Sequence, residues 1–145
     1  MTPSSLLSLQ SVSHHFEEPS HGRLQVLDRI ELNIERGERV AILGPSGSGK
    51  STLLSLMAGL QAPSSGTVFW GELPLRSLPE KKLAKIRPKK IALVFQQFLL
   101  IPHLTALENV SLPLELQGRA QSEATELAKK KLGELGLAER LDHFP

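Results

Sequence analysis

Alternating hydrophobic and polar residues near the amino terminus predict two strands. Apolar positions alternate loosely over Leu6–Ser13, which predicts an edge strand, and more regularly over Val26–Ile34. A half-buried strand has this two-residue period because successive side chains point to opposite faces of a sheet. Between them, Glu17–Gly22 contains a proline and a glycine and is expected to turn. A third, short strand is expected at Thr67–Trp70.

Two further runs are almost continuously apolar, without the alternation of a half-buried strand. They are Arg39–Leu43 and Ile91–Phe95. Short apolar runs of this kind are typical of parallel strands that are buried on both faces. We therefore expect both segments to lie in a parallel sheet that helices cover.

Two helices are expected in the first two thirds of the chain. One begins near Lys50 and ends at Gly59, because a glycine is the favoured residue just past a helix end. The other runs from Pro79 through Arg87, since proline is well suited to the first turn of a helix. Pro88 is expected to stop this second helix, because it lacks the backbone N–H that the next turn requires.

The last third of the chain has a helical period. Thr105 and Glu108 form the pattern T-x-x-E of a capping box, which opens a short helix that Pro113 is expected to end. Ser122–Leu135 has apolar residues on one helical face and predicts an amphipathic helix. Leu137–Phe144 is expected to begin another short helix. Strands, a loop, a helix, more strands and then helices make an α/β layout with an antiparallel element in front.

Composition narrows the class of protein. The 145 residues are enough for one domain or part of one, and 40% of them are hydrophobic. The absence of cysteine excludes disulfides, metal–thiolate sites and a cysteine nucleophile. No apolar run approaches the roughly eighteen residues of a membrane span, and the amino terminus lacks the basic start of a signal peptide. We expect a soluble, cytosolic protein whose membrane contact goes through a partner.

One stretch carries recognisable chemistry. It fits the phosphate-binding pattern G-x-x-x-x-G-K-[ST] without a mismatch and lies between a predicted strand and a predicted helix. A Gly/Ser-rich run is also compatible with a plain flexible loop, but the strand–loop–helix context favours phosphate binding. The candidate residues are Gly44, Pro45, Ser46, Gly47, Ser48, Gly49, Lys50, Ser51 and Thr52.

The pattern has a physical reason. Glycines let the backbone turn tightly and approach a polyphosphate without a Cβ in the way. The N–H groups from about Gly47 to Thr52 can then point into one concavity, to which the helix adds the positive end of its dipole. Lys50 is expected to reach the β- and γ-phosphates of a nucleotide, and Ser51 to offer its hydroxyl to Mg²⁺.

The motifs together resemble those of a known family. Residues Val40–Thr52, Val94–Gln96 and Leu104–Val110 are similar to the ATP-binding subunit of ABC transporters, and the resemblance extends over about Leu6–Pro145. Its details look closest to the subgroup that serves lipoprotein-releasing and macrolide-export permeases. The resemblance implies a P-loop NTPase core with a parallel sheet and flanking helices, an antiparallel β element at the amino terminus, and the start of a helical subdomain. The implied cofactors are ATP and Mg²⁺.

The resemblance also assigns roles outside the loop. Gln96 matches the Q-loop glutamine, which contacts Mg²⁺ or its water and senses the γ-phosphate; alternatively it is an exposed polar cap on a strand. Lys50 and Gln96 are thus the candidate catalytic residues, and Ser51 and Gln96 the candidate metal ligands. Phe16 matches the aromatic residue that stacks on adenine, although a core phenylalanine at a strand end is an equal alternative. His14 and His15 are neighbours without metal-ligand spacing, and both are expected to be exposed rather than functional.

The resemblance divides the chain near the Q-loop. Residues 1–97 correspond to the core with its antiparallel element, and residues 98–145 to the start of the helical subdomain. Phe98–Pro102 is unusually apolar for a loop. In the family this region forms the cleft that receives a cytoplasmic helix of the permease; packing against the chain's own helices is the alternative.

Basic residues gather in two places. A solvated helix face, or contact with acidic lipid headgroups, explains them better than nucleic acid, because no aromatic residues are interleaved and no nucleic-acid-binding module is recognised. We therefore expect no nucleic-acid partner. The basic residues are Lys81, Lys82, Lys85, Arg87, Lys89 and Lys90 in one cluster and Lys129, Lys130 and Lys131 in the other.

The resemblance implies an ATP-binding subunit that powers a membrane permease by ATP binding and hydrolysis. It would act with a second copy or a paralogous domain at the inner face of the cell membrane. The family's signature motif, Walker B strand and switch histidine would follow Pro145, so the sequence resembles an incomplete, N-terminal piece of the domain. We expect it not to hydrolyse ATP alone, and to leave an apolar sheet edge uncovered.

Two other functions stay open at this level. One is a nucleotide-binding piece that is catalytically inert or acts only by pairing with a full-length relative. The other is a small P-loop kinase, which would need acceptor-binding arginines and a lid. Arg76, Arg87 and Arg119 do not form an obvious arrangement of that kind.

Overall fold

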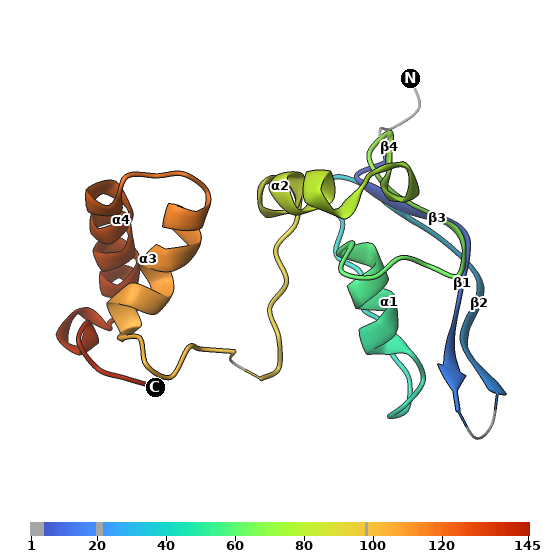
Figure 1. Cartoon of the computed structure of the whole chain (residues 1–145), viewed down its shortest axis with the longest axis horizontal. Coiled ribbons are helices and arrows are strands. Elements are labelled where there is room, and N and C mark those ends of the chain that lie inside the picture. Colours follow the sequence, from blue (N-terminus) through green and yellow to red (C-terminus); the bar gives the residue numbers. More distant parts are fainter. Residues whose placement is uncertain (1–4, 20–21, 98) are drawn as a thin grey trace. The chain divides into compact units, whose positions relative to one another are not determined.

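The computed structural model describes residues 5–19, 22–97 and 99–145. It divides into two compact units, one ending at Leu93 and the other running from Val94 to Pro145, and each is described here by itself (Figure 1). The first unit contains β1 (Leu7–Glu18), β2 (Gly22–Ile34), α1 (Lys50–Met57), β3 (Ser65–Trp70), β4 (Leu73–Pro74), the short helix η1 (Leu75–Ser77) and α2 (Glu80–Lys90). The second contains α3 (Ala106–Leu116), α4 (Gln121–Glu134) and the short helix η2 (Ala138–Arg140).

The strands of the first unit form one antiparallel sheet. Their order is β2-β1-β3-β4, and every neighbouring pair is antiparallel. The predicted strands at Leu6–Ser13, Val26–Ile34 and Thr67–Trp70 are therefore confirmed, and all three are longer than the pattern indicated. The edge position predicted for the first of them is wrong, because β1 pairs with β2 on one side and β3 on the other.

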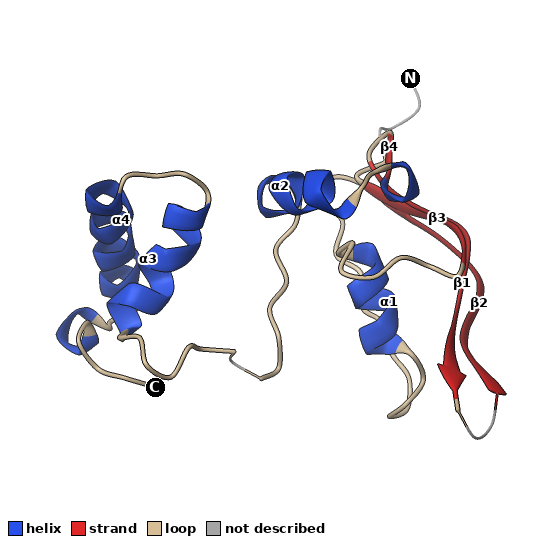
Figure 2. Ribbon diagram, viewed as in Figure 1, coloured by secondary structure: helices blue, strands red, loops and turns tan. Residues whose placement is uncertain are grey.

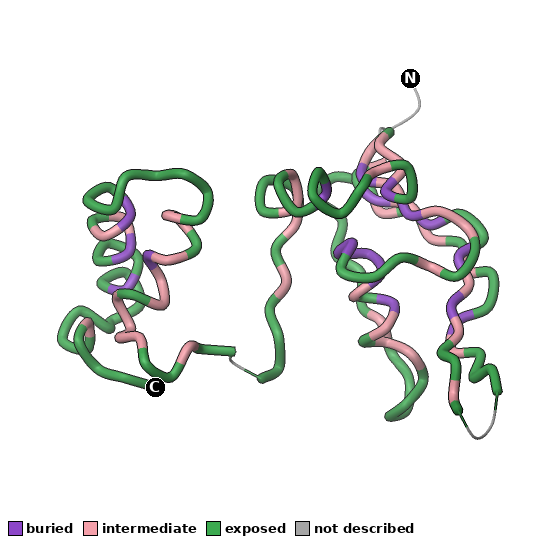
Figure 3. Tube along the Cα trace, viewed as in Figure 1, coloured by how far each residue is buried: buried purple, intermediate pink, exposed green. Residues whose placement is uncertain are grey.

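The core of this unit lies between the sheet and α1. Leu9 and Val12 of β1 and Leu56 of α1 are 1%, 0% and 0% exposed. Buried positions recur along the sheet and α1 (Figure 3). The indole N–H of Trp70 donates to the carbonyl oxygen of Met57 at 2.9 Å, so β3 is tied to the last residue of α1. The sheet and this buried face fix where α1 begins and therefore where the preceding loop lies.

Two helix predictions are confirmed at their ends. Past α1, Gly59 has φ 65°, its N–H bonds the carbonyl of Leu56, and the next N–H bonds that of Ser55. This is the Schellman pattern, which favours glycine because a Cβ is strained at positive φ. At the start of α3, the Thr105 hydroxyl accepts from the Glu108 N–H, and the Glu108 carboxylate accepts from the Thr105 N–H, as the capping box predicts.

Two prolines that were expected to end helices lie inside them instead. α2 continues past Pro88 to Lys90, and α3 continues past Pro113 to Leu116. A proline removes one N–H donor, but the following N–H groups can still find carbonyl partners. In α2 the N–H of Ile91 bonds the carbonyl of Arg87 at 3.0 Å, so the last turn closes.

The second unit is a pair of packed helices. α4 matches the amphipathic helix predicted for Ser122–Leu135, and Ala124, Ala128 and Leu132 form its buried face. The helix expected over Leu137–Phe144 is only the short turn η2.

The two predicted parallel strands are absent from the described residues. Arg39–Leu43 and Ile91–Phe95 are loop in the structure (Figure 2), and within them Leu43 is 89% and Val94 96% exposed. The predictions are wrong because a strand requires hydrogen-bonded neighbours, and no described segment pairs with either run. Apolar composition alone does not supply a partner.

Candidate functional site

The phosphate-loop motif forms a tight turn that leads directly into α1. Gly47 and Gly49 have φ values of 78° and 86°, which side chains with a Cβ rarely adopt. A Cβ on Gly49 would also lie 2.9 Å from Val26 Cγ1 and 3.1 Å from the Val26 carbonyl oxygen. Glycine is thus required at Gly49 by backbone conformation and by its close approach to β2.

The ammonium group of Lys50 lies within the curve of this loop. Its Nζ donates to the carbonyl oxygens of Gly44 at 3.0 Å and Pro45 at 2.5 Å, and lies 3.4 Å from the Ser48 hydroxyl. A positive charge that is held by weak neutral acceptors is well placed to exchange them for the anionic oxygens of a phosphate, since charge-assisted hydrogen bonds are the stronger ones.

The helix that follows favours an anion at the same place. Lys50, Ser51 and Thr52 form the first turn of α1, whose N–H groups have no partner within the helix. No acidic side chain lies in that first turn to compete for these donors. The positive φ angles, the inward lysine and the free helix end together fit a phosphate group.

A divalent cation finds few ligands of its own here. Ser51 offers one exposed hydroxyl next to the loop. Among the described residues, no cluster of three or more His, Asp or Glu side chains could hold a metal ion. Mg²⁺ at Ser51 would therefore take most of its oxygen ligands from phosphate and water, as this ion commonly does.

Phe16 lies at the end of a row of side chains on one face of β1. Its ring meets the His14 ring edge-on, with centroids 4.8 Å apart and an interplanar angle of 84°. Phe16 is 40% exposed, whereas His14 is 9% exposed and its Nδ1 has no hydrogen-bond partner among the described residues. The expectation that His14 is exposed was wrong, because it shares the face of Val12; the two-residue period of the strand was the signal that could have indicated this.

The aromatic pair is linked to the phosphate loop through β2. His14 is paired with Leu27 across the sheet, and Phe16 with Leu24. Leu27 in turn contacts the loop, since its Cδ2 would lie 3.1 Å from a Cβ on Gly49. The structure thus connects Phe16 and the glycine turn within one unit, and leaves Phe16 partly exposed to solvent.

Gln96 is exposed and lies in the second unit, whereas the phosphate loop lies in the first. The adjacent apolar loop is described from Leu99 onward, while Phe98 lies outside the described residues. Leu99 and Leu100 are 64% and 51% exposed, so neither is buried against the helices of its own unit.

Asn109 is a structural residue that the sequence reasoning did not single out. Its side-chain amide donates to the carbonyl oxygens of Ile101, Leu104 and Thr105 at 3.2, 2.9 and 3.0 Å, and its oxygen accepts from the Ile101 N–H at 2.8 Å. Asn109 therefore fixes the end of the apolar loop onto the first turn of α3. A polar residue on the inner face of an amphipathic helix was the available signal.

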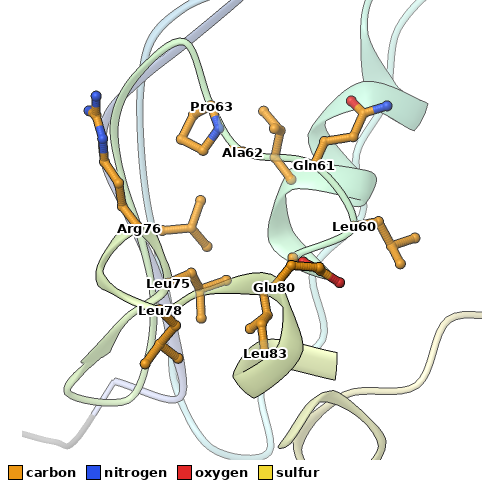
Figure 4. Close-up of a pocket in the computed structure, with 12 residues that line it drawn as sticks. Leu60, Gln61, Ala62, Pro63, Leu75, Arg76, Leu78, Glu80 and Leu83 are labelled. Atoms are coloured by element: carbon orange, nitrogen blue, oxygen red, sulfur yellow. The ribbon is translucent and has the colours of Figure 1, made fainter. Parts of the chain in front are cut away.

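An apolar hollow of about 260 Å³ lies elsewhere in the first unit, between the end of α1, η1 and α2 (Figure 4). Leu75, Leu78 and Leu83 line it, and the guanidinium of Arg76 points away from them. No residue of the phosphate loop lines this hollow. Its lining is mostly apolar, and it is separate from the candidate phosphate site.

No helix in the described part of the chain has the length and apolar content needed to cross a membrane.

Comparison with known proteins identifies the family. The ABC transporter family model matches residues 27–144. The chain is 47% identical over 135 residues to the ABC transporter ATP-binding protein YbbA of Escherichia coli K12, covering 91% of this chain and 59% of YbbA. It is 41% identical over 144 residues to the lipoprotein-releasing system ATP-binding protein LolD of Shewanella frigidimarina, covering 99% of this chain and 60% of LolD.

A solved structure agrees with the sequence comparison. The ATP-binding cassette MJ0796, in a dimeric post-hydrolysis state bound to ADP and Pi, matches with a TM-score of 0.87 at 38% identity, covering 96% of this chain and 61% of that one. The chain thus spans about 60% of the length of these relatives. Its backbone has the cassette fold over that span, and the chain belongs to the ABC transporter family of ATP-binding proteins, close to YbbA and LolD.

Proposed function

We propose that the chain is an ATP-binding subunit that powers an ABC transporter permease through ATP binding and hydrolysis. The observation that carries the proposal is the turn before α1, in which the Lys50 ammonium lies against the loop's own carbonyls beside the free N–H groups of the helix. This arrangement suits a polyphosphate better than any other ligand class.

Each residue has a defined part in the proposed site. The N–H groups from Gly47 to Thr52 bind the phosphate oxygens, and Lys50 leaves its carbonyl partners to bind the β- and γ-phosphates. Ser51 supplies a hydroxyl to Mg²⁺. Phe16 stacks on the adenine, which explains a half-exposed aromatic residue at the end of a buried row.

Coupling to the permease is assigned to the segment around Gln96. We propose that residues 1–97 form the nucleotide-binding core with its antiparallel element, and residues 98–145 the start of a helical subdomain. Gln96 would sense the γ-phosphate and contribute to the metal site. The exposed loop that includes Leu99 and Leu100 would receive a helix of the permease, since exposed apolar side chains mark protein-binding surfaces.

The proposed assembly is a pair of cassettes. MJ0796 is dimeric in its post-hydrolysis state, and we propose that this chain pairs with a second copy or a paralogous ATP-binding domain. It would lie in the cytoplasm, peripheral to the inner face of the membrane. We propose that it binds ATP on its own and hydrolyses it only when it is paired.

The test is fluorescent ATP binding to the chain and to Lys50→Ala. Loss of the charged donor is expected to weaken binding roughly ten- to a hundredfold, the range of a lost charge-assisted hydrogen bond. Lys130→Ala, at an exposed position of α4, is the matched control and should bind as the unmodified chain does. Equal binding by both variants would contradict the proposed site.

A second measurement separates the alternatives. Mg-ATPase activity is measured for the chain alone and after mixing with a full-length relative. A motor subunit hydrolyses ATP only when paired, an inert piece does not hydrolyse it in either case, and a kinase transfers phosphate to a small acceptor. Hydrolysis by the chain alone that Lys50→Ala abolishes would overturn the expectation that it requires a partner.

A further inference from the structure

The positive charge of the chain is concentrated on one helix. α2 (Glu80–Lys90) carries five lysines and one arginine against a single acid, Glu80. The whole chain has seventeen basic and fifteen acidic residues. Outside α2, therefore, eleven basic residues stand against fourteen acidic ones, and the rest of the chain is net negative.

α2 is held firmly by its other face. Leu83 is 7% exposed and belongs to the core of the first unit. The Arg87 guanidinium donates to the Gly59 carbonyl at 2.6 Å and pairs with Glu80 at 3.0 Å. Glu80 and Arg87 thus hold the helix next to Gly59, just past the end of α1, and no lysine of α2 takes part in these bonds.

Four of the lysines share the outer face. With 100° of rotation per residue, Lys81, Lys82, Lys85 and Lys89 fall within an arc of about 100° on the side opposite Leu83. All four side chains are exposed. They form a lysine face, defined by these four residues, whose direction is fixed because the helix beneath it is anchored.

The lysine face differs from the basic run of α4. There, Lys129 pairs with Glu126 at 3.1 Å and Lys131 with Glu134 at 2.7 Å, so the charges are balanced within the helix. None of the four residues of the lysine face has an ion pair with any described residue. The face is therefore an uncompensated positive surface.

The side chains of the lysine face indicate which class of partner it can bind. Lysines are compact point charges without the planar fork of arginine, and the face carries no aromatic ring on which a base could stack. It also carries no large apolar side chain that could insert into a bilayer. Such a surface fits a broad layer of negative charge rather than a shaped ligand. We propose that the lysine face binds the headgroups of anionic lipids at a membrane surface.

This goes beyond the proposed function, in which the permease provides the membrane contact. The lysine face requires neither the permease nor the nucleotide, because none of its residues belongs to the phosphate loop. It would orient the subunit by direct electrostatic contact with the lipid, at a strength that falls with salt.

The test is sedimentation of the chain with lipid vesicles at low salt. Vesicles of equal parts phosphatidylglycerol and phosphatidylcholine are compared with vesicles of phosphatidylcholine alone. Binding is expected to the first and not to the second. The triple variant Lys81→Gln, Lys85→Gln, Lys89→Gln should bind about a hundredfold more weakly, since each lysine near an anionic surface contributes roughly a fivefold factor.

The matched control is the triple variant Lys129→Gln, Lys130→Gln, Lys131→Gln, which removes the same charge from α4 and should bind within about threefold of the unmodified chain. Circular dichroism checks that both variants keep their helices. Equal loss in the two triple variants, or equal binding to neutral vesicles, would overturn the proposal. Displacement of the chain from the vesicles by duplex DNA at an equal phosphate concentration would also overturn the proposal, because it would identify a nucleic-acid surface. Lys50→Ala should bind vesicles normally, which separates this result from a failure of the nucleotide site.

Discussion

β1 and Arg39–Leu43 lie in the same unit and were both predicted to be strands, but only β1 is one. β1 has hydrogen-bonded neighbours on both sides, and its inward residues Leu9 and Val12 are almost completely buried. Arg39–Leu43 has no paired neighbour among the described residues, and Leu43 is 89% exposed. The difference shows that an apolar run becomes a strand only where another segment supplies the partner.

The largest expected effect is a difference in the free energy of unfolding when a leucine is shortened in β1 or in Arg39–Leu43. Leu9→Ala should lower the free energy of unfolding by about 2–5 kcal/mol, because it opens a cavity in a packed core. Leu43→Ala removes the same atoms from an exposed site and should change it by less than about 0.5 kcal/mol. Urea unfolding followed by circular dichroism measures both. Comparable losses would mean that Arg39–Leu43 is paired in solution.

An effect of intermediate size tests an element that needs no distant partner. Thr105→Ala removes the hydroxyl that caps α3 and should lower stability by about 1 kcal/mol. Ser122→Ala, at an exposed position in the first turn of α4, is the control and should stay within about 0.5 kcal/mol. The measurement is the urea midpoint of the helical signal. If both variants were equally stable, the cap would not contribute to holding α3.

These cases indicate how far the sequence determines the fold. The capping box at Thr105, the glycine past α1 and the phosphate-loop turn were predictable because their hydrogen bonds join residues a few positions apart. The strands at Arg39–Leu43 and Ile91–Phe95 were wrongly predicted because their pairing depends on other segments. Pro88 and Pro113 were overestimated as helix breaks, because neighbouring bonds and packing offset one missing donor.

In the candidate site, too, some features could be predicted from the sequence and others could not. The loop residues come together through local geometry, so the motif predicted their placement in one turn before a helix. The burial of His14 beside Phe16 depends on the sheet around it and was missed. The amide bonds of Asn109 were missed as well, although they join residues only four to eight positions apart. The roles of Phe16 and Gln96 in nucleotide binding stay predictions, which Phe16→Ala and Gln96→Ala in the fluorescent ATP assay would test.

Substitutions in the exposed apolar runs Arg39–Leu43 and Ile91–Phe95 are expected to change stability little and self-association clearly. Leu43→Lys and Val94→Lys should leave the free energy of unfolding within about 0.5 kcal/mol, because both positions are exposed. They should reduce self-association, since unpaired apolar strand-forming segments recruit other chains. Light scattering against concentration is the measurement. Leu116→Lys, at an exposed leucine at the end of α3, is the control; an equal reduction there would point to general hydrophobicity instead.

The smallest effect concerns the charge in the capping box. Hydrogen bonds from the Thr105 backbone N–H and from its hydroxyl lower the pKa of Glu108. The folded state thus favours the ionised carboxylate, and its stabilisation is complete above the ordinary glutamate pKa of about 4.3. It is lost as the pH falls through the lower pKa of the folded state.

Glu108→Gln separates this loss from the titration of the other carboxylates, because glutamine can still accept the Thr105 N–H but does not ionise. Urea unfolding of both proteins from neutral pH down to acid measures the difference in stability between them. The unmodified chain should be the more stable at neutral pH, and the difference should shrink once the pH falls below the ordinary glutamate pKa. A difference that stayed constant across this range would mean that the carboxylate charge adds nothing to a cap that Thr105 already provides. The local cap would then depend on hydrogen-bond geometry alone.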